Sequence, residues 1–171
     1  MGSEPDLEMK TFLILLNGLI TLTSMDGFSA EIPNQDAMRA QEMIRILKEE
    51  GAAGKIARLE VLYLPARILT RTQTSPQMLE KNYHYRLVIT NTSVAQTLDS
   101  FVNALEKTKM TQRKDGADFR WACLIYDKND VRILSIFLDG ECTKAAIGDL
   151  SVILDGPLNN WFKANFLNCF E

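Results

Sequence analysis

The pattern of apolar and polar residues is clearest between residues 119 and 138, where two apolar runs flank a short polar segment. Both runs are rich in β-branched and aromatic residues, and the segment between them contains Asn129, which tolerates the positive φ of a tight turn. The pattern therefore predicts a β-hairpin. Both sides of each predicted strand are largely apolar, so we expect the hairpin in the interior of a sheet, covered on both faces.

Helical spacing of apolar residues predicts amphipathic helices at 35–50, at 92–110 and after Pro157. Gly51 is expected to end the first of these helices. Serine followed by proline at 75–76 predicts a further, short helix. The residues expected on the buried helix faces are Ala37, Ala40, Ile44, Leu47, Val94, Leu98, Phe101, Val102, Leu105, Leu158, Trp161 and Phe162.

Extended segments occupy the intervals between these helices. Residues 56–74 alternate in the manner of a long strand that Pro65 interrupts, and residues 83–90 predict another strand. The polar segment 111–118 is expected to be a loop. Gly148 begins a predicted two-residue turn between two short strands.

These elements indicate an α+β fold. The last strands follow one another through turns rather than crossover helices, which favours a mixed or mainly antiparallel sheet. We expect the hairpin 119–138 at its centre, packed by about three helices. With 171 residues, 46% of them hydrophobic and 24% charged, the chain has the size and composition of one globular domain.

The N-terminal segment has the parts of a secretory signal. Lys10 precedes an apolar run at 11–23, and a polar stretch of small residues follows it up to residue 30. A basic start, an apolar segment of about 7–15 residues and a small residue at the cleavage site characterise such signals. We therefore expect a leader at 1–30 and a single domain at 31–171, located in the periplasm or outside the cell.

Two features of this leader depart from the usual pattern. Phe28 stands where a small residue is preferred, and three acids precede Lys10, which suggests that Met9 is the biological start. The alternatives are that residues 11–22 form a buried first element of the domain, or that they stay uncleaved and tether the domain to a membrane. Because the apolar run is short and interrupted, we expect no stable membrane span after signal cleavage.

The net charge of the chain does not indicate a class of partner. The chain has 19 basic and 22 acidic residues, a net charge of -3, and removal of residues 1–30 takes away one base and four acids, leaving 18 of each sign. Nucleic-acid-binding proteins usually carry a basic stripe, and this sequence has none, so we expect no nucleic-acid partner. Net charge also gives no support for electrostatic steering towards a strongly charged partner.

The three cysteines are Cys123, Cys142 and Cys169. Their spacing matches no zinc motif and the chain has one histidine, so we expect neither a metal nor a cofactor. Cys123 alternates with apolar residues in a strand and is interpreted as a buried hydrophobe. In an oxidising compartment Cys142 and Cys169 could form a disulfide that holds the last helix to the sheet, worth about 3 kcal/mol. The alternative is free buried thiols.

Arginines are the candidate binding residues. Six of them lie in predicted strands, and if they gather on one face they could bind an anionic ligand or a partner's acids through bidentate contacts. Alternatively, they pair with Glu60 and the aspartates on a solvated face. The six are Arg58, Arg67, Arg71, Arg86, Arg120 and Arg132, and the residues we select for a site are Arg67, Arg71, Arg86 and Arg120.

No catalytic constellation is evident. His84 lies in a predicted strand without a recognisable nucleophile, and no Gly-Xaa-Ser-Xaa-Gly elbow occurs, so we assign no catalytic residue. The carboxylates beside the hairpin are interpreted as turn residues. We therefore expect an exported, non-catalytic binding protein whose partner is a protein or a small ligand. The alternative is an exported hydrolase whose acids and His84 assemble only in three dimensions.

Overall fold

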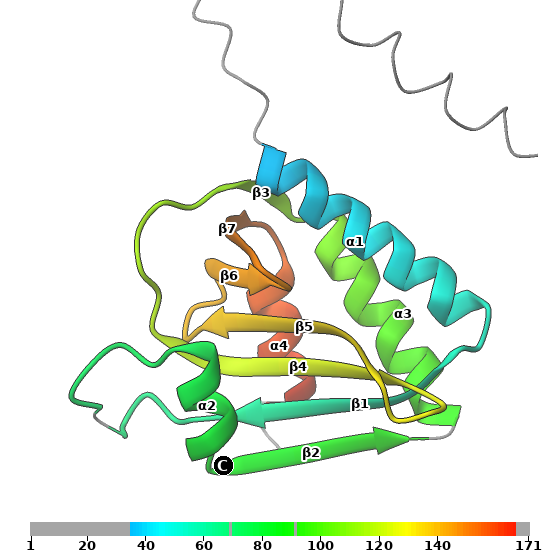
Figure 1. The fold of residues 1–171 in the computed structure, drawn as a ribbon, viewed down its shortest axis with the longest axis horizontal. Coiled ribbons are helices and arrows are strands. Elements are labelled where there is room, and N and C mark those ends of the chain that lie inside the picture. Colours follow the sequence, from blue (N-terminus) through cyan, green and yellow to red (C-terminus); the bar gives the residue numbers. More distant parts are fainter. Residues whose placement is uncertain (1–34, 69, 91, 167–171) are drawn as a thin grey trace, which may run out of the picture. The chain divides into compact units, whose positions relative to one another are not determined.

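The computed structural model describes residues 35–68, 70–90 and 92–166, which form four helices and seven strands (Figure 1). The helices are α1 (Gln35–Ala52), α2 (Pro76–Asn82), α3 (Thr92–Glu106) and α4 (Leu158–Phe166). The strands are β1 (Ile56–Tyr63), β2 (Tyr85–Thr90), β3 (Lys109–Gln112), β4 (Phe119–Asp127), β5 (Arg132–Asp139), β6 (Lys144–Ile147) and β7 (Leu150–Asp155). The α+β fold expected from the sequence is confirmed.

The strands form one antiparallel sheet in the order β2-β1-β4-β5-β6-β7-β3. The predicted hairpin is β4 and β5, and it lies in the interior of the sheet because β1 and β6 pair with its two outer edges. Its turn is closed by the carboxylate of Asp127, which accepts hydrogen bonds from the backbone N–H groups of Asn129 and Val131. Asp130, rather than Asn129, has the positive φ, 64°.

Three helices cover one face of the sheet, here called the three-helix face. Helix α1 runs beside α3 (Figure 1), and α4 packs against α3. The predicted buried positions Ala37, Ala40, Ile44 and Leu47 of α1 are all buried. Aromatic rings join α3, β4 and α4: Trp121 lies 5.3 Å from Phe162 between ring centroids, and Phe162 lies 5.9 Å from Phe101.

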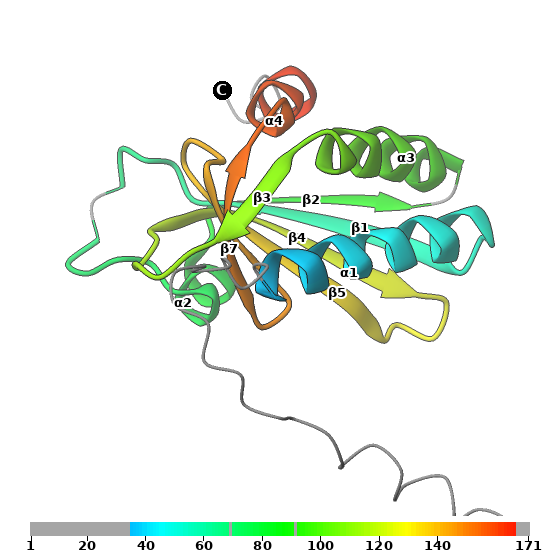
Figure 2. The same ribbon diagram turned by 90° about the horizontal axis from the view of Figure 1, so that it is seen from above.

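The opposite face of the sheet, the α2 face, is covered in part by α2. Figure 2 shows this short helix on the side of the sheet away from α3 and α4. Its one buried residue, Leu79, is fully enclosed and belongs to a second apolar cluster. This cluster includes Leu62 of β1, Leu64 directly after β1, and Leu124 of β4. Both faces of the central strands are therefore buried, as their two-sided apolar pattern predicts.

The long strand predicted at 56–74 is wrong beyond Tyr63. Leu64 still donates its N–H to the carbonyl of Arg120 at 2.9 Å, but the chain then turns, and the N–H of Ile68 donates to the carbonyl of Pro65 at 3.0 Å. Proline has no N–H to continue a ladder, so the strand ends here rather than bulging. The described residues of the remainder, 64–68 and 70–75, belong to a loop that leads into α2 and is here called the loop 64–75.

The loop predicted at 111–118 is also wrong in part, because α3 ends at Glu106 and β3 follows at Lys109–Gln112. This edge strand pairs with β7, and Arg113 continues the contact by donating its N–H to the carbonyl of Ser151 at 3.0 Å. Met110 is the one buried residue of β3. A four-residue strand with a single apolar position leaves no alternation for sequence analysis to detect.

Gly51 does not end α1, which extends to Ala52; the residue with the left-handed backbone is Gly54, with φ 65°. The reason for glycine at position 51 is packing. A Cβ there would lie 2.8 Å from Cδ2 of Leu98, so its absence lets α3 approach α1 closely.

The described residues belong to a unit that spans Ile32–Glu171. None of the described helices is long and apolar enough to cross a membrane. The expected leader at 1–30 lies outside the described residues, and so does Cys169.

Candidate functional site

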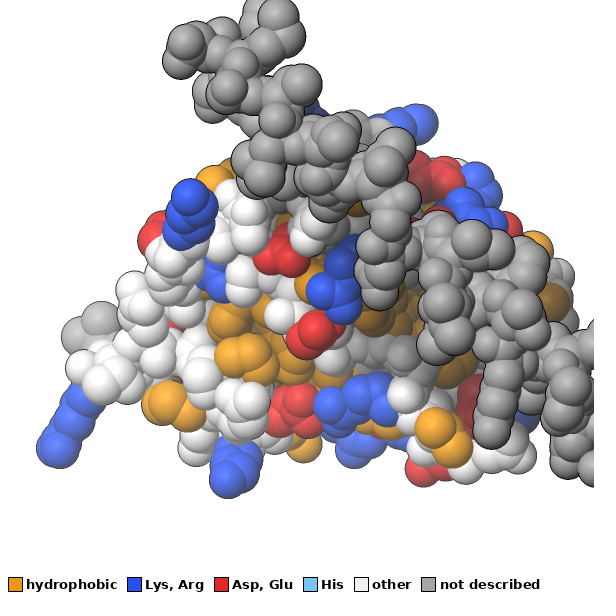
Figure 3. All heavy atoms as spheres, turned by 45° about the horizontal axis from the view of Figure 1, so that its top comes forward, with side chains coloured by type: hydrophobic (Ala, Val, Ile, Leu, Met, Phe, Trp, Pro, Cys, Tyr) orange, Lys and Arg blue, Asp and Glu red, His pale blue; other side chains and the backbone are white. Residues whose placement is uncertain are grey.

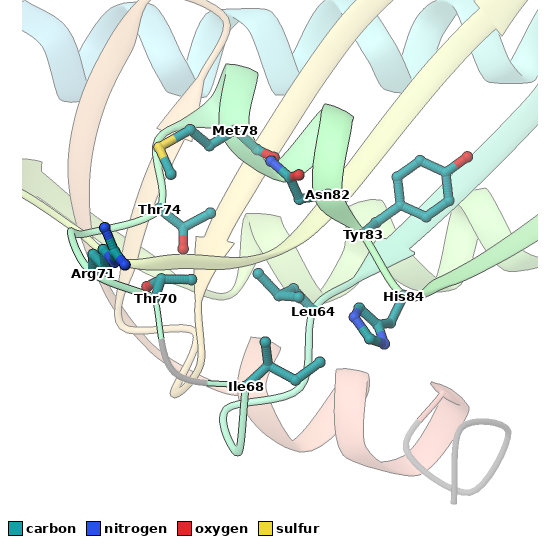
Figure 4. Close-up of a pocket in the computed structure, with 9 residues that line it drawn as sticks. All are labelled: Leu64, Ile68, Thr70, Arg71, Thr74, Met78, Asn82, Tyr83 and His84. Atoms are coloured by element: carbon teal, nitrogen blue, oxygen red, sulfur yellow. The ribbon is translucent and has the colours of Figure 1, made fainter.

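A cleft of about 550 Å³ opens between the loop 64–75 and α2 (Figure 4). Its volume falls within the range of small-molecule sites, about 300–1,000 Å³. All of its lining residues come from one stretch of chain: Leu64, Ile68, Thr70, Arg71, Thr74, Met78, Asn82, Tyr83 and His84.

Helix α2 forms one wall of this cleft, and its start is determined locally. Ser75 has an extended backbone and accepts a hydrogen bond from the N–H of Met78 at 3.2 Å, while Pro76 occupies the first turn. Both residues favour a helix start at this point. Leu79 then anchors the helix to the sheet, which leaves Met78, one residue earlier, at the cleft.

The opposite wall is held by an ion pair between Arg120 and Asp118. Arg120 donates to the carbonyl of Ile68 at 3.0 Å and, more weakly, to that of Pro65 at 3.5 Å. Asp118 accepts from the N–H of Thr74 at 2.8 Å and from Nε of Arg120 at 2.8 Å. The pair therefore fixes both ends of the loop to the start of β4.

Burial opposes ionisation of Asp118, but the hydrogen bonds from Thr74 and Arg120 outweigh it and hold the pKa of this carboxyl below its ordinary value. Asp118 is therefore ionised at neutral pH, and its charge is matched by Arg120. Arg120 was selected from the sequence as a binding residue. The structure places its guanidinium beneath the loop, with 8% of the residue exposed.

Two polar side chains of the cleft wall, Arg71 and His84, are exposed and make neither an ion pair nor a side-chain hydrogen bond among the described residues. The hydroxyl of Thr74 is buried, and the Thr74 side chain helps to lower the pKa of Asp118. In Figure 4 this hydroxyl points into the cleft and the His84 ring borders it, whereas the Tyr83 ring turns away.

Arg67 and Arg71 lie in the loop 64–75 rather than in a strand, and both are exposed. Arg71 lines the cleft, whereas Arg67 is absent from its lining. No acid occurs between residues 61 and 79. Glu80 of α2 and Asp118, which holds the loop, pair with Arg132 and Arg120. The cleft lining thus carries positive charge only.

Arg86, the fourth arginine predicted from the sequence, is not part of the cleft lining. It pairs with Glu60, which is 4% exposed and also pairs with Arg58. Arg58 stacks over the ring of Tyr126, with its guanidinium carbon 3.9 Å from the ring centroid. The structure therefore separates the selected residues: Arg71 in the cleft, Arg67 beside it, Arg120 beneath it and Arg86 in an ion-pair network.

Acidic and basic side chains are interspersed around a central hydrophobic area on the face drawn in Figure 3. This distribution agrees with the many cross-strand and cross-loop ion pairs, such as Lys144 with Asp115 and Arg132 with Glu80. Such pairs leave little net field over the surface.

Cys123 and Cys142 are buried free thiols. Burial raises the pKa of the Cys123 thiol far above its ordinary value, as expected for an inert hydrophobe. Burial, together with the negative charges of Asp139 and Glu141, raises the pKa of Cys142 to about 12. The pairing of Cys142 with Cys169 stays a prediction. No group of three or more His, Cys, Asp or Glu within the described ranges is placed to hold a metal ion.

The chain was compared with protein-family models, with curated proteins and with solved structures. None of them matches. The candidate site therefore depends on the geometry of the cleft alone.

Sequence analysis missed most of this site. Leu64, Ile68 and Thr74 look like parts of an extended segment, and Met78 like one apolar residue of a short helix. The local signal that could have found the cleft is the combination of Pro65 and the Ser75 cap, which predicts a turn and a helix start ten residues apart. The convergence of His84 on the same space has no local signal.

Proposed function

We propose that this chain is an exported, non-catalytic binding protein that holds a small ligand in the cleft between the loop 64–75 and α2. The observation that carries the proposal is the set of unpartnered polar groups around an apolar floor. Leu64, Ile68 and Met78 supply apolar surface. Arg71 and His84 stand beside it without partners among the described residues, and both could fix a ligand's orientation. A few polar groups in a mostly apolar depression are typical of ligand sites.

The competing function is that of a hydrolase that uses His84. A histidine that activates a hydroxyl or a water needs a partner to orient it, usually a carboxylate within hydrogen-bond distance. Among the described residues no acid lines the cleft, and the side chain of His84 has no hydrogen-bond partner. This arrangement favours binding over catalysis.

Export is tested by sequencing the N-terminus of the protein made in its own host, after fractionation of the cells. We expect a new N-terminus at or near Glu31 in the periplasmic or secreted fraction, because residues 1–30 have the order of parts of a secretory signal. An intact N-terminus in the cytosol would contradict export. Peptide mapping of the same material without reduction tests the Cys142–Cys169 disulfide.

Catalysis is tested by assaying the full chain and its His84→Ala variant against p-nitrophenyl esters of short and medium acyl chains. We expect the two proteins to give the same rate, equal to the background, because no acid is placed to orient His84. Turnover that disappears in His84→Ala while the circular dichroism spectrum is unchanged would instead establish the hydrolase.

A further inference from the structure

We infer that the ligand of this cleft is a small amphipathic carboxylate, with its charge on Arg71 and its apolar body on the floor. The inference rests on the proposed function and gives the chemical class of the ligand. Two observations carry it: the charge of the lining and the apolar floor.

The first observation is the charge. Arg71 carries the only formal charge among the described lining residues at neutral pH with His84 neutral, and it makes no ion pair there. The acids near the walls are already paired: Glu80 with Arg132, and Asp118 with Arg120. An anionic group is therefore the complementary partner. The planar fork of a guanidinium matches a carboxylate through two parallel hydrogen bonds.

The second observation is the floor. Leu64 is buried, and Ile68 lies partly buried against the same apolar cluster as Leu79. Met78 is exposed at the other wall, at 37% of its surface, and its flexible thioether can adapt to different ligand shapes. A ligand that carried charge alone would leave this surface in water, so the ligand also needs an apolar portion.

The single cationic group of the lining fits a ligand with one negative charge rather than two. A single guanidinium can pair with one carboxylate, whereas a phosphate dianion requires more cationic groups than the lining offers. Arg67 lies in the same loop but outside the lining, so it can add attraction at a distance without touching the ligand.

The test is a titration of the isotope-labelled full chain with four probes, followed by the amide NMR signals of residues 64–84. The probes are octanoate, octanamide, octylamine and acetate. We expect octanoate to shift these signals with a dissociation constant at least about tenfold lower than that of octanamide, since the two differ in charge and not in shape. We expect octylamine and acetate not to saturate.

Variants then assign the contacts. We expect Arg71→Gln to weaken octanoate binding by about tenfold and to leave octanamide unchanged, whereas the matched control Arg67→Gln, with the same change of charge, alters octanoate binding by less than about twofold.

The outcomes separate the two proposals. Equal affinity for octanoate and octanamide at these signals would overturn the carboxylate but keep the binding cleft. Equal losses in Arg67→Gln and Arg71→Gln would overturn the contact with Arg71, because they would indicate long-range attraction. If neither these probes nor a diverse fragment set shifts the signals of residues 64–84, the binding cleft itself fails.

Discussion

At the scale of single residues, two buried arginines differ in what surrounds them. Arg120 is matched by Asp118 and by two loop carbonyls. Arg113 is 9% exposed, lies over the ring of Phe119 and donates one hydrogen bond, from Nη2 to the hydroxyl of Ser151 at 3.2 Å. Its Nε and Nη1 atoms are buried without partners, and no acid pairs with it in the described part of the chain.

We therefore predict opposite effects of removing these two charges. Arg113→Met keeps the length and the contact with Phe119 but removes an unmatched buried charge, and should raise the free energy of unfolding by about 1 kcal/mol. Arg120→Met removes the guanidinium that pairs with Asp118 and donates to the carbonyl of Ile68, and should lower the free energy of unfolding by about 2 kcal/mol. Urea unfolding of both variants is the measurement, and destabilisation by Arg113→Met would contradict the prediction.

At the scale of elements, two glycines with left-handed backbones end structural units in different surroundings. Gly54, φ 65°, follows α1, and a Cβ there would meet nothing within 4 Å. Gly148, φ 59°, begins the turn between β6 and β7, and a Cβ there would lie 2.7 Å from Cε of Met43. At both positions the left-handed backbone disfavours residues other than glycine. Only at Gly148 would an added Cβ also be crowded, by the side chain of Met43.

We predict that Gly54→Ala lowers the free energy of unfolding by about 1 kcal/mol, the penalty of a left-handed backbone. Gly148→Ala should lower it further, by an additional amount below about 1 kcal/mol, because the flexible end of Met43 can move. In a Met43→Ala background the two glycine substitutions should have equal effects by chemical denaturation. If Gly148→Ala remained more destabilising than Gly54→Ala in that background, the turn, and not Met43, would cause the additional destabilisation.

At the scale of the whole unit, the two apolar clusters share the same central strands. Trp121 and Cys123 of β4 face the three helices, whereas Ala122 and Leu124 of the same strand face α2. If the helices on one face of the sheet unfold, the central strands that also carry the apolar cluster on the opposite face therefore become exposed. The cleft depends on this coupling, since one wall is tied to β4 by Arg120 and the other by Leu79.

We predict one cooperative unfolding transition for the domain 31–171, with the same midpoint by far-ultraviolet circular dichroism, by tryptophan fluorescence and by the NMR signals of α2. The tryptophans report the three-helix face, and α2 reports the other. An earlier midpoint for the α2 signals would contradict the shared-strand argument and would mean that the cleft can open while the sheet stays folded.

The sequence by itself determined the elements that have a strong local period. The hairpin β4–β5 and the helices α1, α3 and α4 each present apolar residues at a spacing of two or of three to four, and such spacing reports burial on one or both sides without knowledge of the partner. It also determined the buried character of Cys123 and the turn at Gly148, since both depend on immediate neighbours.

Only the tertiary structure decided the edge strand β3, the loop 64–75 and the cleft. Strand β3 forms because β7 supplies hydrogen-bond partners about 40 residues later in the chain. A four-residue segment carries no local pattern that predicts this pairing. The loop is held by contacts from Asp118 to Thr74 and from Arg120 to Pro65, which span 44 and 55 residues. Contacts between residues so far apart produce no periodic pattern in the sequence. The fold class could therefore be derived from local patterns, and the site could not.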